Sequence, residues 1–448
     1  SGRINMERMR LLRTISYAPF IMAGAILLTS CTTNTADVNE PGTPVVSTDA
    51  GSMETDAVID YTTPEQLPGI IVDRRAYSSQ EVKYAWVVAE QMPASFNVID
   101  EKSGEVVLET VPEKVTYDSE KEVYHAKIKF GEIVKEGTYY IEENTLGRSY
   151  SFEIIDGYYE AEFDSFIETE FAKCEDMSIT LDEVYSLLYI GERYSISLKD
   201  SSKLWDAVKK WIEAYDASGL NADEAGLMAA IEAKMSFNYS PVEGDAEDAK
   251  LPDKWISDAK TLYSGITNRD GEIAEDTKFL ALAELYRVAG NHEYGEAISD
   301  MYSYINGLES IHTSEKYLYG SMCYMNTHRT VNRSLCDIFM QSLLMSCEDI
   351  SWDKTLLAPQ NDGRTDTDIL LNYAQQLIAM NYVLDGYQYN ELVVSIDHYM
   401  SGRNYEGYIC NAEEEYPADA IVVLSWLALL EKNGKLDPSA PVVWEYSW

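Results

Sequence analysis

The chain contains 448 residues, and its 76 acidic against 35 basic residues give a net charge of −41 and a pI near 4.3. This length predicts two or three folded units, and a hydrophobic share of 46% is typical of a globular protein with a real core. The negative charge excludes nucleic acid and anionic membrane surfaces as expected partners, because both present phosphate groups.

The N-terminal residues resemble a bacterial lipoprotein signal. The basic stretch MERMRLLRT is followed by ISYAPFIMAGAILL, which is too short to span a membrane comfortably, and then by LTSC. In such a signal Cys31 becomes the first mature residue and carries the lipid. We therefore expect residues 1–31 to be a tag remnant and signal peptide, and the mature protein to be extracytoplasmic, membrane-anchored at the bacterial cell surface. A generic signal peptide or a buried apolar segment is the alternative.

Residues 32–66 are predicted to form a flexible linker. The segment TTNTADVNEPGTPVVSTDAGSMETDAVIDYTTPEQ is rich in Thr, Ser, Asp and Pro and contains few large apolar residues. A segment of this composition does not bury enough apolar surface to fold by itself. We expect it to hold the folded part of the chain away from the membrane.

Residues 67–157 show the alternating pattern of β-strands. Short segments such as KYAWVVA, SFNVID, VYHAKIKF, GTYYIEE and SYSFEII are rich in β-branched and aromatic residues, and turn segments such as DEKSG separate them. Short strands at this spacing predict an immunoglobulin-like β-sandwich, a domain of about 100 residues. No catalytic group of residues stands out in this part.

Residues 158–448 show helical spacing of apolar residues instead. Segments such as LDEVYSLLYIGERY and ADAIVVLSWLALLEKNG follow this pattern, and several helices are predicted to end at a glycine. Two segments, LYRVAGNHEYGEA and MNYVLDGYQYNEL, share a joint in which a helix runs into Gly290 or Gly386 and the next begins near an aromatic residue. This recurrence predicts stacked helical hairpins that close into a toroid.

The cysteines after Cys31 do not predict a metal site. They lack the CxxC or Cys/His spacing of zinc ligands, and their odd number rules out a complete set of disulfides. We expect most of them to be small buried side chains. They are Cys174, Cys323, Cys336, Cys347 and Cys410.

The order of these parts resembles family 9 glycoside hydrolases, the cellulase family. The strand domain carries VDRRAY, GTYYI and YSFEI, and the helical part carries FLALAELYRVAGNHEY and a helix pair that ends in the turn SGRN, residues 401–404. The resemblance covers most of residues 68–448. It implies an immunoglobulin-like β-sandwich followed by an (α/α)6-type helical barrel, and inverting hydrolysis of β-1,4-glucan.

The resemblance also implies a proton donor shortly before the last helix. Counting back from Asp419 and Ala420 places Glu413 at the position of the family's catalytic acid, with Ala412 where the family has asparagine. An inverting glycosidase needs such an acid, together with an opposed carboxylate that activates water. The alternative is that the three consecutive glutamates at 413–415 are solvated acids at a helix N-terminus, where Pro417 also fits.

The catalytic base implied by the family is less well preserved. In EFAKCEDMSITLDEV, Asp176 takes the place of the second aspartate of the family motif, while Lys173 takes the place of the first. A lysine does not replace an acid that helps to hold water. The alternative is that Glu175 and Asp176 merely begin a helix together with Asp182 and Glu183.

Substrate binding is expected from rings that stack on sugar faces. We expect Arg403 and the loop aromatics Tyr405, Tyr408 and Tyr416 to bind the substrate. Trp255 and Trp352 are further candidate rings. The family's histidine-containing substrate motif is absent between SGRN and Glu413. The histidines of the chain are scattered, and each is expected on the surface or satisfied in the core.

No cofactor is required for this chemistry, although family members often hold structural calcium. The acid-rich segment NDGRTDTD contains Asp362, Asp366 and Asp368 but lacks the full spacing of a calcium loop. A hydrated loop followed by a helix N-cap at Asp366 or Thr367 is the alternative.

Three functions from different classes are compatible with the sequence. The first is a surface-anchored endo-β-1,4-glucanase-type glycoside hydrolase that acts on β-glucan or a related plant polysaccharide. The second is a catalytically inactive glycan-binding or assembly module with the same fold, which the lost aspartate and the missing histidine motif favour. A purely structural surface protein, which would bind no sugar, is the third alternative.

Overall fold

The computed structural model describes residues 69–119, 121–352, 366–404 and 417–437. The described residues belong to one compact unit, which contains both the strands and the helices. The predicted signal peptide, Cys31 and the predicted linker lie outside the described residues and stay predictions. No helix among the described residues is long and apolar enough to cross a membrane.

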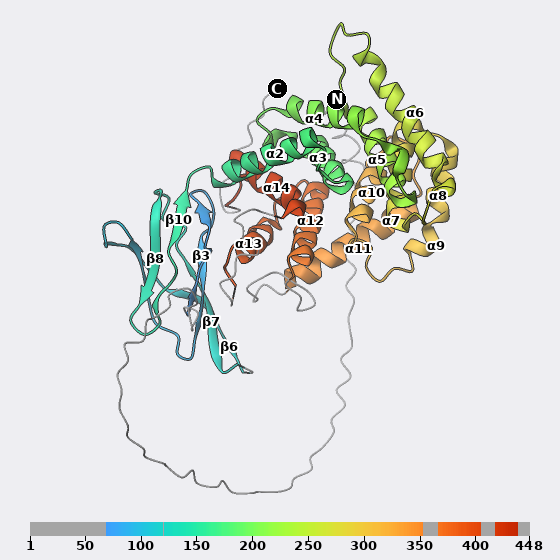
Figure 1. The fold of residues 1–448 in the computed structure, drawn as a ribbon. Helices are drawn as coiled ribbons and strands as arrows, with labels where there is room; N and C mark the ends of the chain where they lie inside the picture. Colours follow the sequence, from blue (N-terminus) through green and yellow to red (C-terminus); the bar gives the residue numbers. More distant parts are fainter. Residues whose placement is uncertain (1–68, 120, 353–365, 405–416, 438–448) are drawn as a thin grey trace, which may run out of the picture. The chain divides into compact units, whose positions relative to one another are not determined.

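Two β-sheets form the first part (Figure 1). The first has the strand order β1-β3-β7-β6, with β1 (Ile70–Ile71), β3 (Tyr84–Ala89), β7 (Val123–Lys129) and β6 (Pro112–Asp118). The second has the order β2-β10-β8-β4-β5, with β9 added beside β8; its strands are β2 (Ala76–Ser78), β10 (Phe152–Ile155), β8 (Gly137–Glu143), β4 (Phe96–Asp100), β5 (Val106–Thr110) and β9 (Gly147–Arg148). All pairs are antiparallel except β2 with β10.

The alternation in the sequence explains how the two sheets meet. In β8, Tyr139 and Ile141 are buried while the residues between and beside them are more exposed. These side chains join Phe96, Ile128 and Phe152 in one apolar cluster. Because successive side chains of a strand point to opposite faces, this register gives each sheet one inner apolar face. The predicted β-sandwich is confirmed.

The second part is helical and begins at Tyr158. The helices that form an inner ring are α3 (Leu181–Arg193), α5 (Ala222–Asn238), α7 (Glu275–Ala289), α10 (Glu315–Met325), α12 (Thr367–Leu384) and α14 (Ile421–Lys432). Those outside it are α2 (Tyr158–Asp176), α4 (Ser201–Ala214), α6 (Leu251–Ser264), α8 (His292–Asp300), α9 (Tyr302–Ile305), α11 (Arg333–Trp352) and α13 (Asn390–Met400). A short 3-10 helix, η5 (Ala418–Ala420), leads directly into α14.

The helix contacts close the ring. Helix α3 packs against α5, α5 against α7, α7 against α10, α10 against α12, α12 against α14, and α14 against α3. Inner and outer helices alternate along the chain, with the consecutive helices α8 and α9 together taking one outer place (Figure 1). This is an (α/α)6 toroid, and the predicted fold class is confirmed.

Burial separates the two layers. Every residue of the inner helix α12 from Leu370 to Asn381 is buried. The outer helix α4 buries only a stripe, which consists of Leu204, Val208, Trp211 and Ile212. A helix that is covered on all sides belongs to a core, whereas an amphipathic helix covers that core. The inside of the ring is therefore filled with side chains rather than open.

The predicted helix ends are partly confirmed. Gly290 ends α7 with a left-handed φ of 68°, a conformation that glycine adopts at little cost. At the second joint the left-handed residue is Asp385, with φ of 49°, and Gly386 follows it. An aspartate tolerates this conformation better than most residues do. The sequence therefore indicates the correct turn there but the wrong residue within it.

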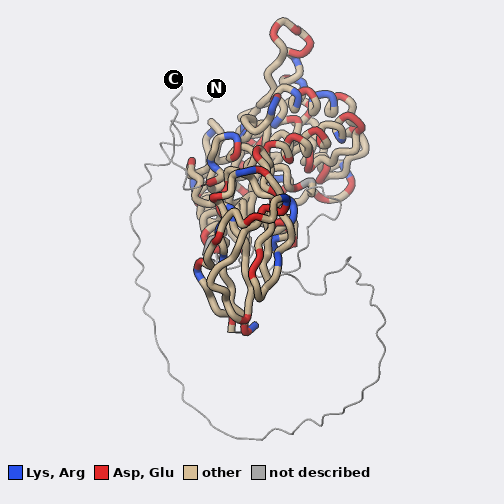
Figure 2. Tube along the Cα trace, turned by 90° about the vertical axis from the view of Figure 1, so that its left-hand side faces the viewer, with Lys and Arg blue, Asp and Glu red and all other residues tan. Residues whose placement is uncertain are grey.

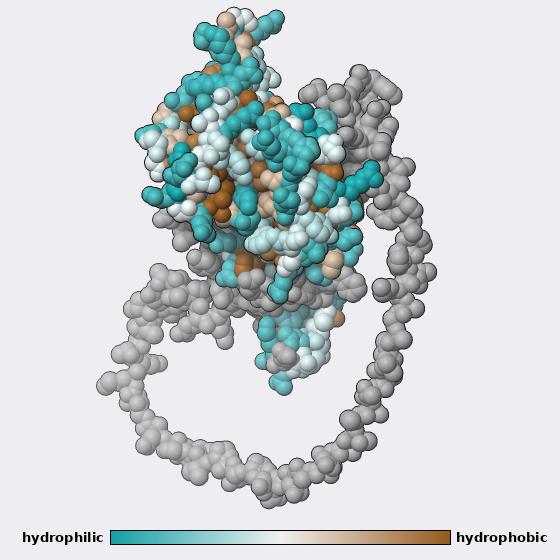
Figure 3. Space-filling view, turned by 90° about the vertical axis from the view of Figure 1, so that its right-hand side faces the viewer, coloured by the Kyte–Doolittle hydropathy of each residue, from teal (hydrophilic) through white to brown (hydrophobic). Residues whose placement is uncertain are grey.

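Charged residues are distributed over the surface. Figure 2 shows acidic and basic residues interspersed along the described chain, with acids more frequent. Figure 3 shows one face of the helical part, on which small apolar patches lie among hydrophilic side chains. Figure 2 shows no extended run of basic residues of the kind that nucleic acid binding requires along the described chain as seen from that side.

A buried polar network joins the sandwich to the helices. The Nδ1 atom of His398, on α13, lies 2.7 Å from Asp73 Oδ2, and its Nε2 atom lies 3.1 Å from Glu81 Oε2. The two carboxylates raise the pKa of His398 to about 10 against the effect of burial, so the ring is a cation between two anions. Ser78 donates a hydrogen bond to Glu431 of α14 in the same region. The junction thus uses charge as well as apolar packing.

Asp397 lies beside this network, and none of the described residues forms a hydrogen bond with its carboxyl group. Its side chain is 1% exposed, and neither carboxylate oxygen has a hydrogen-bond partner among the described residues. Burial raises the pKa of Asp397 to about 7, while the charge of His398 opposes this shift and that of Asp73 adds to it. The carboxyl group is therefore protonated in the folded state under mildly acidic conditions.

We expect Asp397→Asn to gain stability over the wild type as the pH rises. The folded state keeps this proton up to about pH 7, whereas the ordinary value of 3.8 applies once the chain unfolds. The wild-type free energy of unfolding must therefore fall between about pH 4 and pH 7. Asparagine does not titrate, so the variant lacks this loss. The free energy of unfolding of the variant minus that of the wild type should therefore grow by on the order of 3 kcal/mol between pH 5 and pH 8. Urea unfolding at both pH values measures it, and an equal difference at both would contradict the prediction.

Candidate active site

The first turns of the inner helices gather at one end of the ring. Lys316 at the start of α10 reaches Asp182 of α3 at 3.3 Å and Asp223 of α5 at 3.9 Å. Ser314, which caps α10, donates a hydrogen bond of 2.6 Å to Asp276 of α7. Gln375 of α12 connects Glu315 to the backbone of Asp419. These contacts place the starts of α3, α5, α7 and α10, together with the middle of α12 and η5, around one opening.

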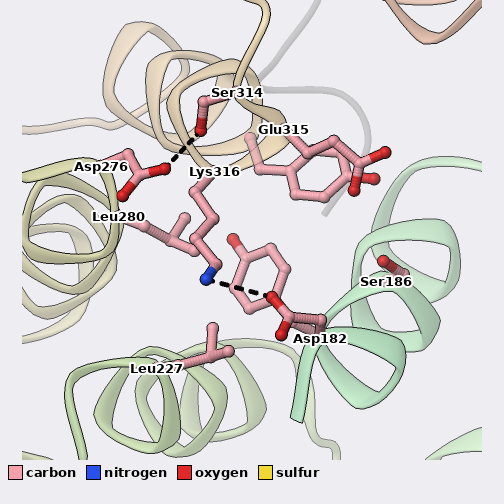
Figure 4. A pocket seen from close by; sticks show the side chains of 10 residues that line it. Asp182, Ser186, Leu227, Asp276, Leu280, Ser314, Glu315 and Lys316 are labelled. Atoms are coloured by element: carbon pink, nitrogen blue, oxygen red, sulfur yellow. Dashed lines mark hydrogen bonds and ion pairs between the residues drawn. The ribbon is translucent and has the colours of Figure 1, made fainter. Parts of the chain in front are cut away.

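A cavity of about 150 Å³ lies at this opening (Figure 4). Its lining consists of Asp182, Tyr185, Ser186, Leu227, Asp276, Leu280, Ser314, Glu315, Lys316 and Tyr319. The volume is below the range of roughly 300–1,000 Å³ that is usual for ligand pockets. It therefore accommodates a small group or part of a sugar ring.

Each inner helix contributes acidic residues to this end. They are Asp182 and Glu183 of α3, Asp223 and Glu224 of α5, Glu275 and Asp276 of α7, Glu315 of α10, Asp368 of α12, and Asp419 of η5, which leads into α14. Acids are favoured in the first turn of any helix, because they meet unpaired N–H groups and the positive end of the helix dipole. Their presence alone therefore does not indicate chemistry.

Glu315 differs from the other acids in its surroundings. Its side chain is largely buried, and burial together with the neighbouring Asp419 raises its pKa to about 7. Gln375 donates a hydrogen bond of 2.6 Å to Glu315 Oε1 and partly opposes this shift. The group lines the cavity, so it holds a proton near neutral pH where a ligand could receive it. A raised carboxyl pKa of this kind is typical of a general acid.

Asp182 has the opposite environment on the other side of the cavity. Its side chain is 64% exposed and pairs with the ammonium group of Lys316. Figure 4 shows Lys316 extended across the cavity from α10 towards Asp182 on α3. The opening therefore combines one buried carboxyl group that holds a proton with one exposed carboxylate that is paired with a cation. Two carboxyls in different environments are what acid and base roles require.

Tyrosine rings form the inner wall of the cavity. Tyr319 packs against Tyr189 with ring centroids 4.3 Å apart and against Tyr185 at 5.7 Å. The hydroxyl of Tyr185 donates a hydrogen bond of 2.7 Å to Glu284. Glu284 belongs to a buried set of ion pairs with Lys234 and Arg287. The wall is thus tied to a charged network deeper in the ring.

Asp176, the predicted base, lies at the C-terminal end of α2. It is exposed, and its carboxylate accepts a hydrogen bond of 2.9 Å from the backbone N–H of Ser178. This bonding to Ser178 lowers the pKa of Asp176. Asp176 therefore ends a helix, and the alternative that it begins one is wrong. The helix that follows is capped instead by Thr180 and Glu183.

Lys173 is engaged in structural ion pairs. Its ammonium group lies 2.7 Å from Glu170 and 3.1 Å from Glu183. It therefore links α2 to the start of α3 at the position where the family resemblance places an acid.

Arg403 does not have the predicted position at the substrate. Its side chain is 0% exposed, and Nη2 donates hydrogen bonds to Tyr84 Oη at 3.1 Å and to Ser395 O at 3.2 Å. The guanidinium also lies 4.1 Å from the centre of the Tyr84 ring. A buried group at the junction between sandwich and helices cannot contact a polysaccharide. The prediction is corrected: Arg403 is a structural residue.

The other predicted site residues are placed as follows. Trp255 is buried in α6 at 1% exposure, so it packs in the core and does not offer a sugar platform. Glu413, Tyr405, Tyr408 and Tyr416 lie outside the described residues, and their roles stay predictions.

Two of the three aspartates in the predicted calcium segment lie among the described residues. Asp362 lies outside the described residues, whereas Asp366 and Asp368 lie at the start of α12. In the parts of the chain that the structure describes, no three His, Cys, Asp or Glu residues are arranged to hold a metal ion.

Comparisons with known proteins agree with this architecture. Residues 65–148 match the family described as cellulase N-terminal ig-like domain. A metagenome-derived glycoside hydrolase family 9 endoglucanase has a similar structure, with a TM-score of 0.60 and 13% identity over 76% of this chain and 84% of that one. A D468A mutant endoglucanase from Alicyclobacillus acidocaldarius gives 0.57 and 13% over 76% and 83%. A Bacteroides ovatus GH9 protein gives 0.54 and 15% over 76% and 86%. No curated protein sequence matches the chain.

Proposed function

We propose that this protein is a glycoside hydrolase that cleaves β-1,4-glucan at the opening of the helical ring. The observation that carries the proposal is Glu315, a largely buried carboxyl group with a pKa raised to about 7 that lines the cavity. The fold, shared with family 9 endoglucanases, supports the substrate class. The shared fold supplies the sandwich and the toroid, while the proposed chemistry depends on side chains of this chain.

Glu315 would act as the general acid. In an inverting reaction its proton passes to the glycosidic oxygen as the bond from that oxygen to the anomeric carbon breaks. The oxygen of a water molecule forms the new bond to that carbon from the opposite face, and a carboxylate base takes a proton from this water. Asp182 is the exposed carboxylate at the same opening and is our candidate for this base. Glu413 and Asp176 remain the alternatives that the family resemblance implies.

A second function is favoured by the cations near the site. Lys173 replaces an expected acid and is held in two ion pairs, and Lys316 holds Asp182. Both arrangements leave fewer free carboxylates to activate water. A catalytically inactive glycan-binding or assembly module with this fold would have these features. In either case we propose that the protein is anchored to the membrane through Cys31 at the bacterial cell surface.

The purified chain should be tested on soluble β-1,4-glucans and on xylan. We expect new reducing ends from at least one β-1,4-glucan, with inverted configuration at the anomeric carbon. Binding measured by calorimetry without any release of reducing ends would reject hydrolysis and establish the binding module. Neither binding nor release from any of these glycans would reject both functions in favour of a structural surface protein.

A further inference from the structure

We infer that Gln375 is a positioning residue that orients Glu315 and limits how tightly it holds its proton. This inference rests on the proposed function, because it concerns the same candidate acid. Gln375 is 2% exposed and lies on α12, so it does not itself reach substrate. Its role is defined by what each atom of its amide group contacts.

The amide of Gln375 connects three elements. Nε2 donates to Glu315 Oε1 on α10 at 2.6 Å and to the backbone oxygen of Asp419 on η5 at 3.4 Å. Its Oε1 accepts a hydrogen bond of 3.4 Å from the hydroxyl of Tyr319, one turn beyond Glu315 on α10. Both ends of the amide are therefore occupied, and the backbone oxygen of Asp419, which can only accept, identifies the end that faces it as the donor. The group cannot rotate to accept a proton from Glu315.

This fixed donor distinguishes the two oxygens of Glu315. Oε1 receives the amide N–H, so it is the oxygen that carries negative charge more readily. No hydrogen bond to Oε2 is recorded among the described residues, which leaves this oxygen to carry the transferable proton. A carboxyl group held in one orientation delivers its proton along one direction, as a general acid requires.

The charges around Glu315 come from several elements. Asp182 of α3 and Asp419 of η5 raise its pKa, whereas Lys316 and the amide of Gln375 lower it. Other titratable groups that line the same cavity are Asp276 of α7, Tyr185 of α3 and Tyr319 of α10. Among these groups Gln375 is the one that acts through a short hydrogen bond to the carboxylate itself.

The test compares Gln375→Leu with Gln376→Leu in the full chain. Gln376 is also buried on α12, but its Nε2 donates to Asn372 Oδ1 instead. The readout is the infrared absorption of the protonated carboxyl group against pH, assigned to Glu315 by subtracting the spectrum of Glu315→Gln. We expect Gln375→Leu to move the midpoint upward by about one pH unit, a tenfold change in proton affinity. Gln376→Leu should leave it unchanged.

An unchanged midpoint in Gln375→Leu, or an equal shift in both variants, would overturn the inference. If Gln375→Leu does not fold, Gln375→Met replaces it with an unbranched side chain of similar length, and the same outcomes apply. The infrared readout needs no turnover, so it separates this inference from the proposed function. With an active protein, the alkaline limb of kcat/KM should shift in the same direction as the infrared midpoint.

Discussion

Glu315→Gln is expected to lower the rate of β-glucan hydrolysis by about 10²–10⁴-fold, the usual contribution of a general acid. Glutamine keeps the size of the side chain and its place beside Gln375 but has no proton of suitable acidity. Because Glu315 has a pKa of about 7, wild-type activity should fall as the pH rises through 7, when the acid becomes ionised. Reducing-end assays from pH 5 to pH 9 measure both effects, and the alkaline decline should be absent from the residual activity of the variant.

Two further variants make this test specific. Glu275→Gln alters another first-turn acid at the same end of the ring, one that pairs with Lys278 and does not line the cavity. It should change the rate by less than about threefold, since an exposed ion pair contributes little. Glu413→Gln tests the acid that the family resemblance implies. Full loss in Glu413→Gln with retained activity in Glu315→Gln would transfer the acid role to Glu413.

Arg403→Met is expected to lower the free energy of unfolding by about 3–5 kcal/mol, the usual cost of removing one partner from a buried charged network. The guanidinium stabilises the negative charge of Asp73 and donates to Tyr84 and Ser395. Methionine fills similar space, but it supplies neither the positive charge nor the hydrogen-bond donors of the arginine. Urea unfolding, followed by circular dichroism, measures the loss.

A surface arginine serves as the control for this prediction. Arg148 pairs with Glu101, and both side chains are exposed, so Arg148→Met should cost less than about 1 kcal/mol. Arg403→Lys keeps the charge but not the planar donor geometry. Its loss of unfolding free energy should lie between those of Arg148→Met and Arg403→Met. If Arg403→Met retained wild-type stability but lost glycan binding, the substrate role predicted from the sequence would be restored.

The fold could be predicted because its signals are local. Alternation of apolar residues marks the strands up to Ile155, and helical spacing begins at Tyr158 with only two residues between. A strand that buries one face needs an apolar side chain at every second residue, whereas a helix that buries one stripe needs one at every third or fourth residue. Glycines such as Gly290 mark helix ends because few other residues adopt their conformation.

The candidate site could not be predicted in the same way. Glu315 follows Ser314 in a segment that reads as an ordinary capped helix start, and acids are common there. What distinguishes it is Gln375, 60 residues further along the chain, and Asp419 beyond that. Arg403 was misplaced for a related reason. The sequence places the turn SGRN at the end of a helix pair, but Gly402 has a φ of 106°, and a Cβ added there would lie 2.9 Å from the side chain of Arg74 in the sandwich.

The buried junction also sets an order in which the protein can be completed. Its bonds join residues far apart in sequence: Tyr84 and Ser395 are separated by 311 positions, Asp73 and His398 by 325, and Ser78 and Glu431 by 353. During synthesis the sandwich emerges before the helices. Its buried polar groups stay unpaired until α13 and α14 have been made. The same helix α14 closes the ring against α3. Both closures therefore depend on helices that are translated long after the sandwich, and such distant pairings are slow to form and leave earlier segments exposed to chaperones and proteases.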